Sequence, residues 1–227
     1  PLMDYRHELK FILNPQDAAI LKKNLSQILE KDPNGDPQGR YMVRSLYFDT
    51  IGGDAFFDKM DGVEVRRKYR IRYYNQDTSF IRLESKLKID DLSNKTQQRI
   101  NLEMAQQLMR GEIGSIPFQT DSVLSDFALD MKLNGLRPSV IVDYQRTAYL
   151  HKALDVRITF DEYIRSRVFD TQLFKTKFGA IDVFDPGEVV MEVKYDDLIP
   201  SAVADLLRQV PMIRLAISKY AYCYNKK

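Results

Sequence analysis

The stretch RRKYRIRYY, residues 66–74, places a basic side chain at every even position from Arg66 to Arg72. The odd positions from Tyr69 to Tyr73 are apolar or aromatic. Because side chains alternate between the two faces of a β-strand, the stretch predicts a strand with one cationic face and one apolar face. Like charges on one strand face repel each other, so the cationic face indicates an anionic partner.

The composition places this strand in an ordinary globular chain. The chain has 227 residues, of which 44% are hydrophobic and 29% are charged, and this profile is typical of a soluble domain with a buried core. The formal net charge is only +2, so the cationic stretch is a local concentration of charge. A protein that coats nucleic acid is expected to carry a basic excess over its whole domain, and this chain does not.

Cysteine and histidine are scarce. Cys223 is the only cysteine, and His7 and His151 are the only histidines, so we expect neither a disulfide framework nor a zinc site built from these residues. No apolar run approaches the roughly 18 residues that cross a bilayer. The N-terminal residues enter an alternating pattern without the apolar core of a signal peptide. These features predict a cytoplasmic protein.

The same alternation recurs along the chain and predicts further strands. In addition to the stretch quoted above, strands are expected at 5–13, 41–50, 79–89, 95–102, 139–150, 155–164 and 188–196. Helices are expected at 14–31, near 52–62, at 103–111, within 112–136 and, as a pair separated near Pro211, at 200–225. No linker, low-complexity tract or repeat divides the sequence, so we expect a single domain over residues 1–227.

The polar faces of the expected strands are biased toward cations. They collect the basic residues Lys10, Arg66, Lys68, Arg70, Arg72, Arg82, Lys86, Lys88, Arg146, Arg157 and Lys194. The carboxylates on these faces are Glu8, Glu84, Asp161 and Glu192. One interpretation is a sheet whose polar face is in water, although such faces usually mix both signs. The other is a set of faces around an anion, because two charges about 4 Å apart interact by about 4 kcal/mol at an effective dielectric near 20.

The second interpretation predicts the fold class. If the strands close into an eight-stranded antiparallel barrel, their polar faces meet in one lumen that can hold a small ligand. The fold is then α+β, an antiparallel eight-stranded β-barrel tunnel with flanking helices. The ligand is a compact polyanion such as a triphosphate or a polyphosphate chain, because the planar fork of arginine donates two hydrogen bonds to phosphate oxygens.

Three carboxylates, Glu8, Glu84 and Glu192, each precede a lysine by two residues on the same strand face. For Glu8 and Glu84 we favour an ion pair across the lumen that positions a cation. Glu192 can play the same role, or it can hold Mg²⁺ or Mn²⁺, because these ions take one or two protein carboxylates and complete their shells with phosphate and water. We assign the metal role to Glu192.

With these residues in view, the sequence resembles the triphosphate tunnel metalloenzymes, and more closely the polyphosphate polymerase domain of the vacuolar transporter chaperone (VTC) family. No single motif is specific, but eight of them follow one another on the expected elements. In order, they are ELKF (8–11), LYFDT (46–50), YRIRYY (69–74), LESK (83–86), DYQRTAY (143–149), VRITFD (156–161), MEVKY (191–195) and SKY (218–220).

The resemblance implies a tunnel of eight antiparallel strands, open at both ends and lined with basic residues. Family members of known activity transfer the γ-phosphate of ATP to a growing polyphosphate chain, with Mn²⁺ or a similar divalent ion. Carried over by position, Glu192 would hold the metal, and the phosphate-binding residues would be Lys10, Arg70, Arg72, Lys86, Tyr144, Arg146, Arg157 and Lys219. Lys88 is a further phosphate-binding candidate. Weaker candidates for the site are Lys59, Glu8 and Lys194.

One departure from the family pattern bears on the reaction. Hydrolytic relatives, of the thiamine triphosphatase and class IV adenylate cyclase types, begin with Glu-x-Glu-x-Lys, whereas this sequence reads Arg6-x-Glu8-x-Lys10. The missing carboxylate favours a metal-dependent polyphosphate polymerase. Two alternatives stay open, namely a noncatalytic module that binds polyphosphate and an inorganic triphosphatase of the same fold.

The resemblance also implies partners. ATP or inorganic triphosphate and polyphosphate are the expected ligands. A membrane-protein partner is also expected, because eukaryotic relatives act beside membrane subunits, and it would associate a cytoplasmic protein with the membrane. Single-stranded nucleic acid could instead stack on Tyr69, Tyr73 and Tyr74. Some of these tyrosines lie on the strand face opposite the cations, where packing against the core explains them better. We therefore expect no nucleic-acid ligand.

Overall fold

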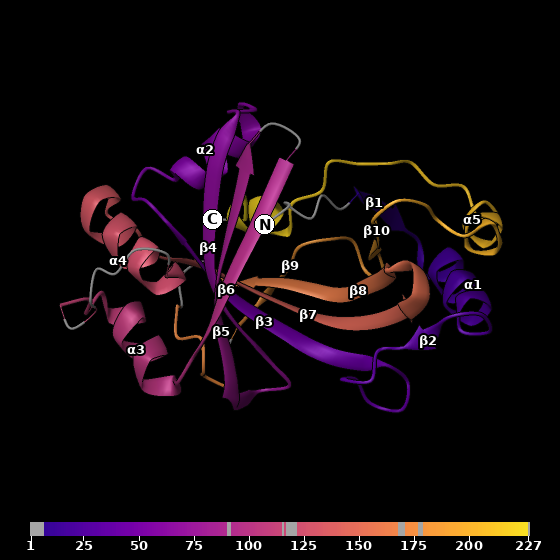
Figure 1. Cartoon of the computed structure of the whole chain (residues 1–227), viewed down its shortest axis with the longest axis horizontal. Helices are drawn as coiled ribbons and strands as arrows, with labels where there is room; N and C mark the ends of the chain where they lie inside the picture. Colours follow the sequence, from indigo (N-terminus) through magenta and orange to yellow (C-terminus); the bar gives the residue numbers. More distant parts are fainter. Residues whose placement is uncertain are drawn as a thin grey trace. The chain divides into compact units, whose positions relative to one another are not determined.

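The computed structural model has an α+β fold built on a large antiparallel sheet (Figure 1). The structure describes residues 7–89, 92–114, 116, 122–167, 171–176 and 179–226. The first two residues of the strand predicted at 5–13 therefore lie outside the described residues, and so does Arg6 of the family motif.

The chain divides into two compact units. Unit 1 comprises residues 1–42, 144–164 and 182–218. Unit 2 comprises residues 43–143, 165–181 and 219–227. The three strands that contribute residues to both units are β3 (Arg40–Asp49), β7 (Arg137–His151) and β8 (Val156–Arg167).

The other elements follow the same division. Those of unit 1 are β1 (His7–Leu13), α1 (Pro15–Leu25), β2 (Glu30–Lys31), the short 3-10 helix η1 (Lys152–Leu154), β10 (Val189–Tyr195) and α5 (Ser201–Leu207). Those of unit 2 are α2 (Asp54–Met60), β4 (Val65–Tyr74), β5 (Asp77–Ile89), β6 (Leu92–Ile100), α3 (Leu102–Arg110), α4 (Val123–Asn134) and α6 (Lys219–Tyr224). The two-residue strand β9 (Ile181–Asp182) lies at the boundary.

The strands pair in the order β1-β10-β8-β7-β3-β4-β5-β6, with β2 added to β7 and β9 to β8. The main path contains eight strands, the number that the sequence predicts, and each predicted strand corresponds to one of them. Among the described residues this path has two ends, β1 and β6. A large antiparallel sheet with flanking helices is therefore confirmed, whereas its closure into a barrel is not.

The segment after β1 becomes a helix for local reasons. Asn14 caps α1 by accepting a hydrogen bond from the backbone N–H of Asp17 at 2.8 Å, and Pro15 occupies the first turn. Leu21 and Leu25 are fully buried in the core of unit 1, among apolar side chains of β1, β8 and β10. The helix predicted from Asn14 is confirmed, although it ends at Leu25, earlier than predicted.

The apolar face predicted from the quoted stretch is the core face of unit 2. Tyr69, Ile71 and Tyr73 are each at most 2% exposed and pack in one cluster with Leu108 of α3 and Phe127 of α4. Figure 1 shows these two helices together beside the strands of this unit. The basic side chains at the even positions of β4 therefore lie on the face away from this core.

Gly187 lies just before β10, the strand that carries Glu192, and allows the chain to pass close to the start of α1. Gly187 has φ of +85°, and a Cβ added to it would lie 2.7 Å from Cγ of Pro15. We predict that Gly187→Ala lowers the free energy of unfolding by more than the roughly 1–2 kcal/mol of a left-handed backbone alone. The matched control is Gly111→Ala, where φ is +76° and no atom lies within 4 Å of an added Cβ. Urea unfolding measures the stability of both variants. Equal decreases in the free energy of unfolding would show that Pro15 moves aside without destabilising the protein.

Candidate functional site

The predicted site residues fall into two sets, one in each unit. Unit 1 holds Glu8, Lys10, Tyr144, Arg146, Arg157, Glu192 and Lys194. Unit 2 holds Lys59, Arg70, Arg72, Lys86, Lys88 and Lys219. In each set the strand register decides which side chains meet.

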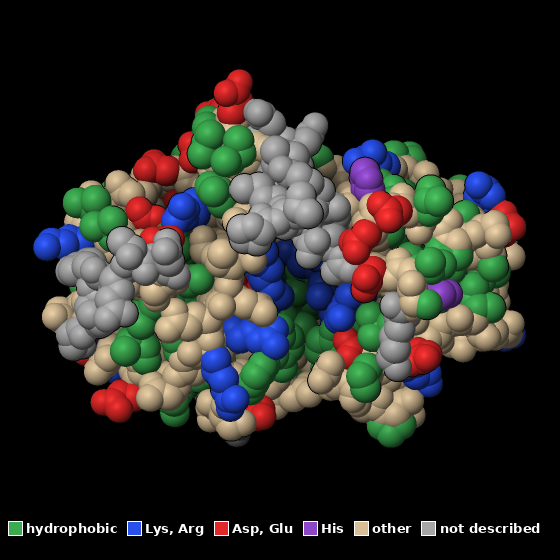
Figure 2. Space-filling model, viewed as in Figure 1, with side chains coloured by type: hydrophobic (Ala, Val, Ile, Leu, Met, Phe, Trp, Pro, Cys, Tyr) green, Lys and Arg blue, Asp and Glu red, His purple; other side chains and the backbone are tan. Residues whose placement is uncertain are grey.

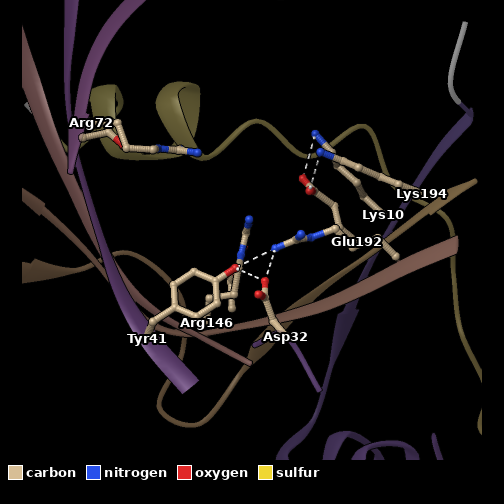
Figure 3. Close-up of polar contacts among 10 residues, drawn as sticks. Lys10, Asp32, Tyr41, Arg72, Arg146, Glu192 and Lys194 are labelled. Carbon is tan, nitrogen blue, oxygen red and sulfur yellow. Dashed lines mark hydrogen bonds and ion pairs between the residues drawn. The ribbon is translucent and has the colours of Figure 1, made fainter. Parts of the chain in front are cut away.

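In unit 1, the pairing of β1 with β10 places Lys10 opposite Glu192 and Glu8 opposite Lys194. Lys10 Nζ lies 2.9 Å from a Glu8 oxygen and 3.4 Å from a Glu192 oxygen, and Lys194 Nζ lies 3.4 Å from the other Glu192 oxygen. Figure 3 shows Lys10 and Lys194 pointing toward Glu192. Lys10 also donates to the carbonyl of Ile217 at 3.0 Å. Glu8 therefore forms an ion pair, but with a lysine of its own strand, and the predicted position of this pair across a lumen stays a prediction.

Arg146 is held by a carboxylate on the neighbouring strand. Its Nε and one terminal nitrogen donate to the two oxygens of Asp161 at 2.7 and 2.8 Å, and Asp161 is fully buried. Burial of the guanidinium opposes its charge, but the attraction of Asp161 outweighs this and raises the pKa of Arg146 well above its usual value. The guanidinium also lies 5.2 Å from the ring centre of Tyr144. Arg146 is therefore charged and fixed in orientation.

Arg157 is held by two residues that the sequence did not single out. One of its terminal nitrogens donates to Oδ2 of Asp32 and to the hydroxyl of Tyr41, each at 2.7 Å. Burial tends to raise the pKa of Asp32, but hydrogen bonds from Asn34 and the charge of Arg157 lower it below its usual value. Asp32 lies in a segment read only as a loop, and no local pattern links it to a strand 125 residues later.

In unit 2, the registers of β4, β5 and β6 bring cations together in rows. Lys68 faces Lys86, which faces Lys95, and Arg66 faces Lys88. We call the side of these strands that carries the basic side chains the cationic face. Its basic residues are Arg66, Lys68, Arg70, Arg72, Arg82, Lys86, Lys88, Lys95 and Arg99. Figure 2 shows Lys and Arg side chains in a row over these strands.

Glu84 is the carboxylate at the centre of the cationic face, and its side chain is 2% exposed. Its oxygens accept from Arg70 at 2.6 Å and from Lys95 at 2.9 Å, so its ion pairs join neighbouring strands, and a pair across a lumen stays a prediction. Burial would raise the pKa of Glu84, but Arg70, Arg72 and Lys95 together lower it far below its usual value. Burial is also the main reason that the pKa of Lys95 falls to about 8, although 44% of its side chain is exposed.

Two hydroxyl groups of β3 complete the anchoring of the arginines. Tyr47 accepts a hydrogen bond from Arg70 at 2.8 Å, and Ser45 accepts one from Arg72 at 2.8 Å. Burial would raise the pKa of Tyr47, but the charges of Arg70, Arg72 and Lys219 lower it below its usual value. The sequence missed Tyr47 and Lys95 as site residues, although both lie in strands where alternation could have placed them on the polar side.

The remaining candidates of unit 2 lie on helices. Lys59 is in the last turn of α2, and Lys219 is the first residue of α6. Tyr220, which follows Lys219, is buried and donates a hydrogen bond to the fully buried Asp49 at the end of β3. This contact fixes the start of α6 and with it the position of Lys219.

The carboxylates of unit 1 fit a divalent ion only together with a ligand. Within the residues that the structure describes, no three His, Cys, Asp or Glu side chains group closely enough to hold a metal ion. Glu192, with Glu8 on the other side of Lys10, offers carboxylate oxygens of the kind that Mg²⁺ and Mn²⁺ bind. These ions commonly take one or two protein carboxylates and fill their shells with phosphate oxygens and water, so Glu192 fits the assigned role.

Over the described part of the chain, none of the helices combines the length and the apolar character needed to span a membrane.

Comparison with known proteins identifies similar sequences and folds. A family model described as VTC domain matches residues 5–226. A Hippeastrum protein taken for an adenylyl cyclase, with a dominant triphosphatase activity, has 17% identity and a TM-score of 0.57, with 98% of this chain and 97% of that chain covered. A protein from Pyrococcus horikoshii has 18% identity and a TM-score of 0.51, with coverages of 98% and 100%.

A third solved structure, a proposed adenylate cyclase from Bacillus halodurans, has 13% identity and a TM-score of 0.50, with coverages of 91% and 87%. At these identities the likeness concerns the fold alone. No curated protein matches the chain.

The ion pairs of Glu84 predict how stability depends on pH. The unfolded carboxyl takes up a proton near pH 4.5, whereas the folded one stays ionised to much lower pH, so its stabilisation is complete above pH 4.5 and is lost as the pH falls below it. Glu84→Gln leaves Arg70 and Lys95 without this charge. We predict a loss of about 3–5 kcal/mol in the free energy of unfolding at pH 7, and a smaller difference from the wild type at pH 3.

The matched control is Glu112→Gln. The pKa of Glu112 is also lowered, through its hydrogen bond with Arg110, but both side chains are 55% exposed. Its replacement should change stability little, because exposed ion pairs contribute little. Denaturant unfolding at the two pH values measures both variants, and similar losses at Glu84 and Glu112 would contradict the role given to burial.

Proposed function

The chain belongs to the VTC domain family, and from this premise we propose that it binds the phosphate chain of ATP and transfers its γ-phosphate to polyphosphate. The observation that carries the proposal is the excess of cations on the cationic face, where the pairings of β4, β5 and β6 set lysines and arginines directly opposite one another. Opposed like charges destabilise a sheet. A bound polyanion would relieve this repulsion.

The anchoring of the arginines supports the proposal. A guanidinium has five N–H donors, and Arg157 uses one terminal nitrogen for Asp32 and Tyr41. Its other donors can face phosphate oxygens while this contact holds the side chain. Binding then costs less side-chain entropy, and a phosphate group is held in one orientation.

We assign the roles as follows. Phosphate binding falls to Lys10, Arg70, Arg72, Lys86, Lys88, Tyr144, Arg146, Arg157 and Lys219. Lys59, Glu8 and Lys194 are supporting residues. Glu8 and Lys194 lie opposite each other on β1 and β10, next to the pair formed by Lys10 and Glu192. Glu192 would hold Mn²⁺ or Mg²⁺, which neutralises phosphate charge when bound.

The reaction asks little covalent chemistry of the protein. A terminal oxygen of polyphosphate attacks the γ-phosphorus of ATP, the bond to the β–γ bridging oxygen breaks, and ADP leaves. Fixed cations stabilise the charge that spreads over the transferring group and align the attacking and leaving oxygens. The proposal therefore needs no serine or histidine nucleophile. The proposal also includes the closed eight-stranded tunnel and the single domain that the sequence predicts. It further includes a membrane protein as the binding partner.

A second candidate reaction uses water as the acceptor, which makes the protein an inorganic triphosphatase. The triphosphatase activity of the Hippeastrum protein, which shares the fold, favours this candidate. The same phosphate-binding residues serve both reactions, and the products distinguish them. Incubation with ATP and Mn²⁺ yields polyphosphate and ADP in the first case, whereas incubation with tripolyphosphate and Mn²⁺ yields pyrophosphate and free phosphate in the second.

We predict that tripolyphosphate raises the melting temperature, because a ligand that binds only the folded protein stabilises it. At a free tripolyphosphate concentration of 100 times the dissociation constant, the free energy of unfolding rises by about 2.7 kcal/mol. Single-stranded DNA of equal total charge should raise the melting temperature much less. Equal shifts would favour a nucleic-acid surface, and no shift with tripolyphosphate would contradict phosphate binding.

The role of Glu192 separates catalysis from binding. Glu192→Gln keeps the shape of the side chain and removes the charge between Lys10 and Lys194. We predict that tripolyphosphate binding in metal-free buffer is kept or strengthened, while Mn²⁺-dependent turnover of ATP falls by at least about a hundredfold, because charge neutralisation during transfer is lost.

The control is Glu162→Gln, which removes a carboxylate that pairs with Lys22 of α1, also in unit 1. This variant should retain turnover. If Glu192→Gln turns over ATP as the wild type does, Glu192 only positions the lysines. If the wild type forms neither polyphosphate nor free phosphate with any divalent ion, the protein is a polyphosphate-binding module.

A further inference from the structure

The cationic face continues past the residues assigned to phosphate binding. Arg72 of β4 lies opposite Arg82 of β5, and Arg82 lies opposite Arg99 of β6, the strand at one end of the described path. Directly opposed residues share a face of the sheet, so three arginines stand in one row. Neither Arg82 nor Arg99 belongs to the set that the family resemblance supplies.

This row lies well away from the lysine row of the same face. Lys86 and Arg82 are four residues apart on β5, which corresponds to roughly 13 Å along a strand. The ion pairs of Glu84 lie between the two rows. A ligand that touches both rows must therefore be a chain of several anionic groups.

The two outer arginines are held over one aromatic ring. The guanidinium of Arg82 lies 4.5 Å from the ring centre of Phe80, and that of Arg99 lies 5.1 Å from it. Arg99 also donates to the carbonyl of Ser79 at 2.8 Å. Cation–π contact offsets part of the repulsion between two guanidinium groups, but it leaves their positive charge in place.

Among the described carboxylates, Asp77 interacts only weakly with the outer end of this row. Asp77, at the start of β5, is exposed, and hydrogen bonds with Ser79 are the main cause of its lowered pKa, with the charge of Arg99 contributing last. The inner part of the face, by contrast, has Glu84 in direct contact with Arg70. The outer row thus combines oriented guanidinium groups with a local excess of positive charge.

We propose that Arg82 and Arg99, whose guanidinium groups contact the ring of Phe80, form an additional binding site, here called the extension subsite. It binds the further phosphates of a chain longer than triphosphate. The subsite rests on the proposed phosphate binding of the inner residues, and it selects long polyphosphate over short ligands. Arginine suits this role because its fork donates two hydrogen bonds to one phosphate group.

Edge protection is the competing explanation for these cations. If the sheet is open and β6 is an edge strand, its charged residues prevent pairing with other chains, and they would then have no ligand. Edge protection predicts that the arginines affect aggregation and not affinity. Stacking of nucleic-acid bases on the aromatic and guanidinium groups is another explanation, and it predicts that single-stranded DNA binds as strongly as polyphosphate.

The test measures the dissociation constants of tripolyphosphate, of polyphosphate of several tens of units and of single-stranded DNA by calorimetry. In the double variant Arg82→Ala/Arg99→Ala, affinity for long polyphosphate should fall at least about tenfold, because each charge-assisted hydrogen bond carries about that factor. Affinity for tripolyphosphate should change less than about threefold, since the inner residues are intact.

Two further variants keep the result interpretable. Arg110→Ala removes an exposed cation that pairs with Glu112 at the end of α3, and it should leave all affinities unchanged. Arg82→Lys/Arg99→Lys keeps the charge and should recover part of the long-chain affinity even if the alanine variant folds poorly.

Equal losses for long and short ligands, or no loss for either, would overturn the subsite while phosphate binding stands. A loss for DNA as large as that for polyphosphate would assign the row to nucleic acid. Failure of the wild type to bind any phosphate chain would overturn both this proposal and the proposed function.

Discussion

Charge compensation inside the sheet is the constraint on which the rest of this structure depends. Removing a charge from water costs several kcal/mol unless a partner of opposite sign and good geometry replaces the water. Asp161 is fully buried and meets Arg146 in a two-point contact, and Glu84, with 2% of its side chain exposed, meets Arg70 and Lys95. The strand registers that create these pairs also determine which cations face one another.

The same compensation occurs in both units, and it suits the anion binding proposed above. A carboxylate or hydroxyl partner orients each key arginine, and in the described strands β4, β5 and β6 of unit 2 cations oppose one another in rows on both sides of Glu84. Lysines that lie opposite one another, such as Lys68 and Lys86, repel each other and so oppose folding of the sheet. A bound phosphate chain would reduce this repulsion. The proposed phosphoryl transfer would rely on positioning and electrostatics of this kind, since such a transfer needs little covalent help.

Much of the fold follows from sequence periodicity. The alternation in 66–74 places Tyr69 and Tyr73 in the core and the arginines on the other face, because consecutive side chains of a strand point to opposite sides. Local signals also placed α1, where an asparagine cap and a proline meet in the first turn. Strand number and the basic character of the site were predictable for the same reason, since both depend on residues close together in the chain.

Which partners meet was decided only by the tertiary structure. Asp32 reaches Arg157 across 125 residues, and the buried Arg44 reaches Asp143 at 2.6 Å across 99 residues while also donating to the carbonyls of Leu173 and Lys175. Such contacts depend on loop paths and on register between distant strands, and neither leaves a periodic signal in the sequence. The sequence by itself determined the two faces of each strand, whereas the register of the folded sheet determined which charges compensate one another.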